Sequence, residues 1–189
     1  MEGPMPRGGI RPLTESEFTE MTAQFPYYKG RWVYVSKALG QVETLIRRRG
    51  ARTALELGVP LRPIVVGADA MDITAGPHVD PAVPMTIHDA TKAPWPVGDK
   101  AYDVFIALQV FEHLRDRQRE AFLEVRRIAR HAVISLPIDW EMDDPTNCHH
   151  RIPEERVLSW FAPIVPTRVI EGSGGRRRRL IYVFEDLPA

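Results

Sequence analysis

Residues 101–137 read AYDVFIALQVFEHLRDRQREAFLEVRRIARHAVISLP, and this stretch decides the fold. Val104–Val110 is an almost unbroken apolar run, which is the pattern of a strand buried on both faces of a parallel sheet. In Asp116–Arg130, apolar residues recur at helical spacing while charged residues occupy the other face, so an amphipathic helix is expected. Ala132–Leu136 reads as the next strand. The stretch therefore predicts a right-handed strand, helix, strand unit.

Length and composition fit one compact domain. The chain has 189 residues, of which 44% are hydrophobic and 26% charged, as is ordinary for globular proteins. Residues 1–12 hold three prolines and three glycines and are expected to form a flexible tail. A single domain is therefore expected over residues 13–189.

Charge and cysteine content limit the partners and the location. Because 25 basic residues balance 25 acidic ones, neither nucleic acid nor an anionic membrane is an expected partner. A single cysteine, Cys148, excludes an internal disulfide and a cysteine-rich zinc site. No apolar run approaches the roughly 18 residues that span a bilayer, and the N-terminus lacks a signal-peptide core. We therefore expect a cytoplasmic protein.

The remaining elements are read in chain order. A capping box formed by Thr14 and Glu17 predicts a helix over Thr14–Gln24, and an apolar stripe that ends before Gly50 predicts another over Gly30–Arg49. Strands are expected at Thr53–Leu57, Pro63–Ile73, Met85–His88, Ile164–Ile170 and Leu180–Phe184. A polar loop is expected at Asp139–Ile152. A short helix is expected after Pro153, packing through Val157, Leu158 and Phe161.

Acidic residues stand where three of the expected strands end. The first strand carries Glu56 and is closed by Gly58, the second ends with Asp69 and Asp72, and the third is followed by Asp89. Open α/β sheets bind ligands at the carboxyl ends of their strands. The pattern therefore predicts one ligand site at that edge of the sheet.

With these residues in place, the chain resembles class I S-adenosylmethionine-dependent methyltransferases of the small-molecule kind called type 11. The resemblance covers Thr53–Leu187 and is carried mainly by IHDATKAPWPVGDKAYDVFIALQVFEHL at 87–114. It implies a three-layer, Rossmann-like α/β fold whose mostly parallel sheet ends in an antiparallel hairpin. It also implies S-adenosylmethionine as cofactor and methyl transfer to a small-molecule acceptor.

The resemblance assigns roles to particular residues. It places Glu56 and Gly58 at the methionine part of the cofactor, Asp69 or Asp72 at the ribose hydroxyls, Asp89 and the Ala90 amide at the adenine, and Gln109 facing the cofactor or the substrate. A carboxylate suits a vicinal diol because it offers two acceptor oxygens.

The first motif departs from the family pattern. At 56–72 the chain reads ELGVPLRPIVVGADAMD, so Pro60 and Arg62 stand where the family has glycines. The interval from Gly58 to either aspartate is shorter than the roughly 20 residues expected between a glycine fingerprint and its ribose acid. The first crossover helix is therefore expected to be missing. Arg62 is either a solvated loop residue or a donor to the carboxylate of the cofactor.

Three histidines are candidate general bases. His113, His149 and His150 qualify because imidazole titrates nearest to physiological pH, although for His113 a structural role, as a cap of the next helix or a packed side chain, is favoured over a catalytic one. The acids, cysteine and histidines of the polar loop show no spacing typical of a zinc or calcium site, so no metal is expected. Arg176–Arg179 are expected to be a solvated hairpin edge.

Two readings from other classes stay open beside the methyltransferase. One is a catalytically silent member of the fold that serves as a binding or scaffolding module, and the weaker one is a nicotinamide dinucleotide enzyme. The dinucleotide enzyme is the weaker reading because the chain has no second half of the usual dinucleotide-binding sheet. The methyl acceptor cannot be read from the sequence, and a homo-oligomer whose partner completes the cavity stays open.

Overall fold

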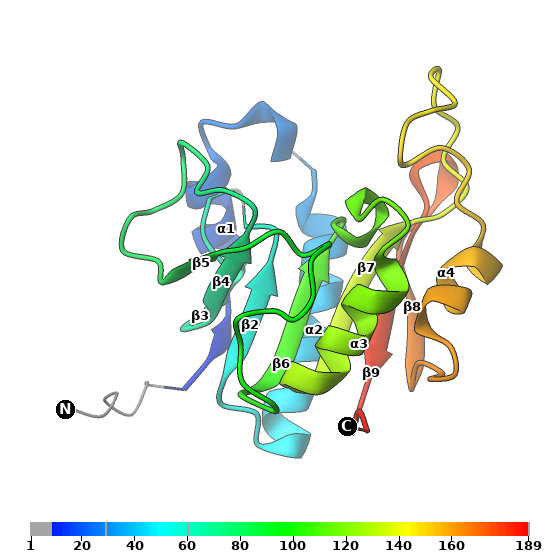
Figure 1. Cartoon of the computed structure of the whole chain (residues 1–189). Helices are drawn as coiled ribbons and strands as arrows, with labels where there is room; N and C mark the ends of the chain where they lie inside the picture. The colour runs from blue at the N-terminus through cyan, green and yellow to red at the C-terminus, as the bar shows by residue number, and fades with distance from the viewer. Residues whose placement is uncertain (1–8, 29, 60, 189) are drawn as a thin grey trace.

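The computed structural model describes residues 9–28, 30–59 and 61–188, and its centre is a seven-stranded sheet (Figure 1). The strand order across the sheet is β5-β4-β2-β6-β7-β9-β8. Their bounds, in that order, are Met85–Ile87, Asp69–Asp72, Ala54–Leu57, Tyr102–Leu108, Ala129–Pro137, Arg179–Phe184 and Arg168–Ser173. The first five strands are parallel, and β9 runs antiparallel to both of its neighbours. The predicted sheet with its closing hairpin is confirmed.

Helices cover both faces of this sheet and make three layers. In Figure 1, α2 (Trp32–Arg49) lies behind the sheet, with α1 (Glu15–Thr22) packed in the same core, while α3 (Gln118–Ile128) and α4 (Glu154–Phe161) lie in front. Three short 3₁₀ turns, η1, η2 and η3, span Pro26–Tyr28, Phe111–His113 and Gly175–Arg177. Among the described residues, no helix has the length and apolar character needed to cross a bilayer.

The central strand β6 shows why the sheet holds two layers of helices. Val104 and Ile106 pack into the core beneath α2, whereas Phe105 and Ala107 pack into the core beneath α3. All four side chains are fully buried. Burial of about 2 kcal/mol per large apolar side chain on both faces makes this strand the centre of the fold. The predicted β6, α3, β7 unit is confirmed.

The helix boundaries follow from local chemistry. Thr14 accepts a hydrogen bond from the Glu17 amide while the Glu17 carboxylate accepts from the Thr14 amide, so the predicted capping box is present. Gly50 ends α2 with a φ of 67°, the left-handed conformation that favours glycine. In α4, Trp160 is buried beside Val157 and Phe161. Leu158 is exposed instead, so the expectation that it packs is wrong.

An extended segment replaces the first crossover helix. No helix occurs among the described residues between Leu57 and Asp69, and Pro60 lies outside them. The returning chain forms β3 (Val65–Val66), which pairs antiparallel with β1 (Arg11–Pro12). An extended residue advances about 3.3 Å and a helical one about 1.5 Å, so a short extended segment suffices to return to the start of a four-residue strand.

The same pairing corrects the expected tail. Arg11 and Pro12 lie in β1, and Ile10 is buried in the core beneath α2. The flexible tail therefore does not extend to residue 12. Residues 1–8 lie outside the described part of the chain.

The expected strand at Pro63–Ile73 is two strands, and this moves Asp69. Gly67, with a φ of 83°, separates β3 from β4, and Asp69 is the first residue of β4. There the Tyr102 hydroxyl donates to its carboxylate at 2.6 Å, at the amino end of the sheet. The expectation that Asp69 lies at the carboxyl end of a strand is wrong.

Candidate functional site

A cavity of about 610 Å³ lies at the carboxyl ends of the parallel strands. Its walls include residues at or just beyond the ends of β2, β4, β5 and β6: Leu57, Gly58, Asp72, His88, Asp89, Leu108 and Gln109. From β2 the chain continues to β4 and then β5 on one side of the sheet, and it returns to β6 on the other side of β2. The order of the strands therefore reverses at β2. Open α/β sheets bind ligands at such a switch point.

The cavity brings most of the predicted site residues together. Its lining includes Glu56, Gly58, Asp72, Asp89, Ala90, Gln109, His113 and His149. Asp69 and His150 are not among the lining residues. The Nδ1 of His150 lies within hydrogen-bonding distance of the backbone of Met142, and its ring borders a smaller depression beside Cys148. The position of His150 does not support the predicted role as a base in this cavity.

Gly58 lies in the cavity wall at a position that only glycine can occupy. Its φ is 77°, and its N–H donates to the Met71 carbonyl at 2.9 Å. A Cβ at this position would lie 2.5 Å from Cγ2 of Val110, which also lines the cavity. Both the backbone conformation and the contact require glycine.

Glu56 holds the shortened loop. Its side chain is buried, and Oε2 accepts a hydrogen bond from the Ile64 amide at 2.8 Å. Burial away from water disfavours the charged form and raises the pKa of Glu56 to about 8, although the amide bonds oppose this shift. The carboxyl group therefore carries a proton near neutral pH in the folded chain.

This shift predicts that stability depends on pH. The folded-state pKa of Glu56 lies above its unfolded value, so its stabilising contribution is complete below the unfolded pKa and is lost as pH rises toward 8. Glu56→Gln keeps an acceptor for the Ile64 amide but does not titrate. Between pH 6 and pH 8 we expect the unfolding free energy of the native chain to fall by about 1–2 kcal/mol more than that of the variant.

Urea unfolding at several pH values measures this difference. Glu155→Gln, which removes an exposed carboxyl group on α4, is the control and should follow the native profile. Parallel profiles for the native chain and Glu56→Gln would contradict a protonated Glu56.

Arg62 lines the cavity with an unsatisfied donor. Its Nε is buried and has no hydrogen-bond partner among the described residues. Leaving a buried donor without a partner costs about 1–3 kcal/mol. The reading of Arg62 as a merely solvated residue does not account for this buried atom.

The two remaining acids in the cavity wall, Asp72 and Asp89, differ in their hydrogen-bond partners. Asp72 Oδ1 accepts only from the Ile73 amide, at 2.7 Å, among the hydrogen bonds of the described residues. Asp89 Oδ1 accepts from the amide and the hydroxyl of Thr91, at 3.0 and 2.7 Å, and the hydroxyl bond is the largest cause that lowers the pKa of Asp89. Asp89 is therefore an ionised group fixed by its own turn.

Gln109 connects the end of β6 with the closing hairpin. Its φ of 59° is unusual for a residue with a side chain and occurs often at functional sites. Its Nε2 donates to the Ser135 hydroxyl at 3.2 Å, and its Oε1 accepts from Nε of Arg179 at 3.2 Å. The guanidinium of Arg179 also lies 4.4 Å from the Trp140 ring centre, so the expectation of a solvated edge is wrong for Arg179.

An aromatic wall was missed by sequence reasoning. Tyr27, Tyr28 and Tyr34, from η1 and the start of α2, line the cavity opposite the strand ends together with Arg31 and Trp140. Arg31 lies 3.7 Å from the Tyr27 ring centre, and Arg179 lies 4.7 Å from that of Tyr34. No motif marks this wall, because η1 and α2 precede β2 in the chain and only the fold brings them over its end.

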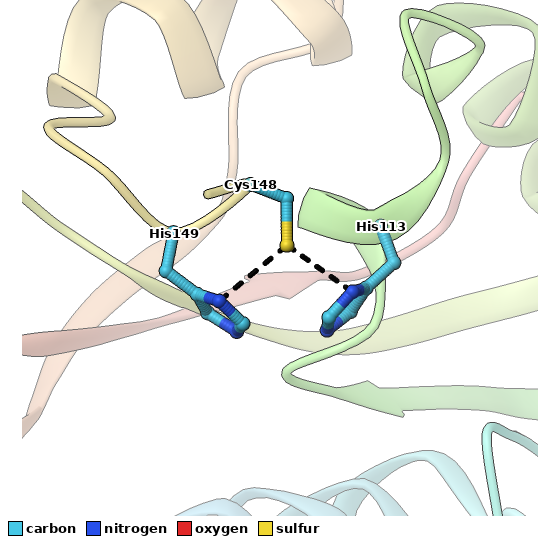
Figure 2. Close-up of side chains that lie close together, drawn as sticks. All are labelled: His113, Cys148 and His149. Carbon is cyan, nitrogen blue, oxygen red and sulfur yellow. Dashed lines mark hydrogen bonds between the residues drawn. The ribbon is translucent and has the colours of Figure 1, made fainter. Parts of the chain in front are cut away.

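His113, Cys148 and His149 meet at the edge of the cavity. Cys148 Sγ lies 3.2 Å from Nδ1 of His113 and 3.4 Å from Nδ1 of His149 (Figure 2). Burial lowers the pKa of both histidines and raises that of the Cys148 thiol. Both imidazoles are therefore neutral near pH 7 and can accept a proton or a metal.

Comparison with known proteins supports the fold. No family model and no curated protein sequence matches the chain. Among solved structures, it is similar to a SAM-dependent methyltransferase from Aquifex aeolicus, with a TM-score of 0.50 and 15% identity over 75% of this chain and 87% of that one.

Two further structures agree with this. N-methyltransferase NodS from Bradyrhizobium japonicum WM9, in complex with S-adenosyl-L-homocysteine, has a TM-score of 0.55 and 15% identity over 81% of this chain and 87% of that one. A putative type 11 methyltransferase from Sulfolobus solfataricus has a TM-score of 0.52 and 11% identity over 79% and 93%. The chain therefore has the fold of the class I S-adenosylmethionine-dependent methyltransferases.

Proposed function

We propose that the protein transfers a methyl group from S-adenosylmethionine to a small-molecule acceptor. One observation carries the proposal: Gly58, Asp72 and Asp89, which follow or end three different strands, line a single cavity at the switch point of the sheet. Its volume of about 610 Å³ is within the range of roughly 300–1,000 Å³ of small-ligand sites. The aromatic and arginine side chains opposite these residues supply the other half of the enclosure.

The residues present fit the cofactor. Asp72 has acceptor capacity for the ribose hydroxyls, and the guanidinium of Arg62, a residue of the cavity wall, suits the carboxylate of the methionine part. Asp89 and Ala90 line the side of the cavity beyond β5, where the adenine is proposed to bind. In this chain Arg62 supplies the positive charge that a crossover helix would otherwise present through its N-terminus.

When bound, the cofactor supplies an electrophilic methyl group on a sulfonium ion. The protein then has to hold an acceptor in line, and correct positioning alone accounts for a large part of such rate increases. The acceptor is proposed to lie between Gln109 and the aromatic wall, where Arg31 in the wall and Arg179 behind Gln109 and Tyr34 favour a molecule with a negatively charged group. His113 or His149, each neutral near pH 7, takes the proton from an acceptor hydroxyl or ammonium.

Asp72→Ala is expected to weaken binding of S-adenosylhomocysteine by about 10- to 100-fold. The variant loses hydrogen bonds between a charged acceptor and two hydroxyl groups, each worth about 1.5–3 kcal/mol before solvent screening. Isothermal titration calorimetry measures the affinity. The matched control is Asp69→Asn, at the opposite end of the same strand, which should bind like the native chain. Equal affinities for the native chain and Asp72→Ala would remove Asp72 from the site.

Arg62→Met is expected to affect only ligands that carry a carboxylate. We expect about a tenfold or greater loss of affinity for S-adenosylhomocysteine, because a charge-assisted hydrogen bond is lost. Affinity for 5′-methylthioadenosine, which has the same nucleoside but no amino-acid part, should stay unchanged. A similar loss for both ligands would show that Arg62 supports the loop rather than the carboxylate.

A further inference from the structure

We infer that His113, Cys148 and His149, with Glu112 behind them, form a binding site for Zn²⁺ in the wall of the cavity. The three candidate ligand atoms are two imidazole nitrogens and one sulfur, and all lie within 4.8 Å of one another. His113 comes from η2 after β6, whereas Cys148 and His149 come from the long loop after β7, so the fold brings them together (Figure 2). This proposal replaces the expectation of no metal.

The distances suit zinc with little movement. A tetrahedral zinc centre has bonds of about 2.3 Å to sulfur and about 2.0 Å to nitrogen, which separates a sulfur ligand from a nitrogen ligand by about 3.5 Å. The observed separations from Cys148 Sγ are 3.2 Å to His113 and 3.4 Å to His149. In Figure 2 the thiol points between the two rings, and both Nδ1 atoms face it. Thiolate and imidazole ligands together favour zinc over magnesium or calcium.

Glu112 gives the independent indication of a metal site. Its side chain is fully buried, and neither carboxyl oxygen has a hydrogen-bond partner among the described residues. Oε1 lies 3.5 Å from Nε2 of His149, the nitrogen on the far side of the ring from Cys148. Metal-bound histidines usually donate their other N–H to a carboxylate, which fixes the ring and raises its basicity. A zinc ion on Nδ1 would leave Nε2–H to donate to Glu112 and would give this buried carboxyl group a role.

One hydrogen bond has to be exchanged. Asn147 Oδ1 lies 2.8 Å from Nδ1 of His149 and also accepts the backbone N–H of His149 at 2.9 Å. In the metal-free chain the ring N–H donates to Asn147, and on metal binding this nitrogen loses its proton while the backbone bond remains. That proton moves to Nε2, where it faces Glu112, so the neutral imidazole loses no proton overall. Binding releases one proton, from the Cys148 thiol, and affinity should therefore increase with pH.

The position of the zinc site in the cavity wall suggests that the ion could bind the acceptor. Both imidazoles line the cavity, and three protein ligands leave a fourth position for water or another small ligand, as in catalytic rather than structural zinc sites. If the proposed methyl transfer is correct, an oxygen or sulfur atom of the acceptor would occupy that fourth position, and the ion would activate it in place of a histidine base, because both imidazoles are then ligands. The metal site itself does not depend on the methyl transfer.

Titration of the reduced chain with Co²⁺, a spectroscopic substitute for zinc, tests the site. We expect one equivalent to produce the visible bands of tetrahedral cobalt and a thiolate charge-transfer band, and Zn²⁺ to displace them. Cys148→Ser should abolish the charge-transfer band, and His113→Gln should weaken binding by more than tenfold. Glu112→Gln should weaken it by about 10- to 100-fold.

His150→Gln is the matched control, because it removes the adjacent histidine that does not belong to the cluster. It should bind cobalt like the native chain. A native chain without tetrahedral bands, bands that persist unchanged in Cys148→Ser and His113→Gln, or their loss in His150→Gln would overturn the proposal. None of these results involves S-adenosylhomocysteine, so a failure here is distinguishable from a failure of the proposed function.

Discussion

Gly58→Ala is expected to lower the unfolding free energy by about 2–4 kcal/mol and to weaken binding of S-adenosylhomocysteine by at least tenfold. Holding alanine at a φ of 77° costs about 1–2 kcal/mol. The new Cβ would lie 2.5 Å from Cγ2 of Val110, and overpacking of this kind costs about 1–3 kcal/mol. Because Gly58 and Val110 both line the cavity, relief of this clash changes its shape.

Gly50→Ala separates the backbone effect from the clash. Gly50 has a similar φ of 67°, but a Cβ there would meet nothing within 4 Å. We expect it to lose about 1 kcal/mol of stability and no affinity. Adding Val110→Ala to Gly58→Ala should recover part of the stability, because it removes the atom that clashes. Chemical denaturation and calorimetry provide both readouts, and equal behaviour of the two single variants would contradict the close approach at Gly58.

Arg127→Met is expected to destabilise the chain by about 3 kcal/mol. Arg127 donates to the Glu124 carboxylate at 2.6 Å and to the carbonyl groups of Val97 and Trp95 at 2.7 and 3.0 Å. Its loss leaves the mostly buried Glu124 charge with the Trp95 amide as its remaining hydrogen-bond partner among the described residues. Removing one partner of such a pair leaves an uncompensated charge.

Two further variants test whether the unpaired Glu124 charge causes this loss of stability. Arg117→Ala breaks an exposed ion pair with Glu120 at the start of the same helix and should cost less than about 1 kcal/mol. Arg127→Met combined with Glu124→Gln should be more stable than Arg127→Met alone, because the unpaired charge is gone. A double variant that is no more stable than the single one would contradict the charge argument. Thermal and urea unfolding measure all three.

Arg127→Met should also weaken binding of S-adenosylhomocysteine. Trp95 is held by Arg127 through its carbonyl, and its indole N–H donates to the Ala90 carbonyl at 3.1 Å. Ala90 lines the cavity, so the loop that Arg127 fixes also positions one of its walls. The loss of Arg127 on α3 is therefore expected to disturb the cavity wall at Ala90 as well as the stability of the chain.

The central unit could be predicted from the sequence because its burial is complete and periodic. A strand buried on both faces leaves an unbroken apolar run, and α3 shows an apolar and a charged face. The missing crossover helix was predicted correctly because too few residues separate Gly58 from the next acid. These inferences depend on local pattern and chain length alone.

The misplaced acid shows where local pattern fails. The pattern of Pro63–Ile73 predicts one strand, but Gly67 turns the chain between β3 and β4 and puts Asp69 at the amino end of the sheet. Gly67 was the available signal, since glycine inside a strand pattern often marks such a break. The position of Asp72 and Asp89 at the carboxyl edge of the sheet could be predicted, because Asp72 ends β4 and Asp89 comes two residues after β5.

The rest of the site could not be predicted because it depends on contacts across long stretches of sequence. His113 and Cys148 are 35 positions apart and meet only because the loops after β6 and β7 lie at the same edge of the sheet. Spacing rules for metal sites consider neighbouring ligands, whereas the proposed zinc ligands pair His149 with the distant His113 rather than with the adjacent His150. The aromatic wall likewise depends on how α2 is packed over the sheet.

Calorimetric titration of the native chain with S-adenosylhomocysteine is the decisive test of cofactor binding in this cavity. We expect saturable binding of one equivalent at micromolar concentrations, weakened in Asp72→Ala and Gly58→Ala and unchanged in Asp69→Asn. Absence of heat at millimolar ligand would contradict it and would favour a catalytically silent protein that keeps only the methyltransferase fold.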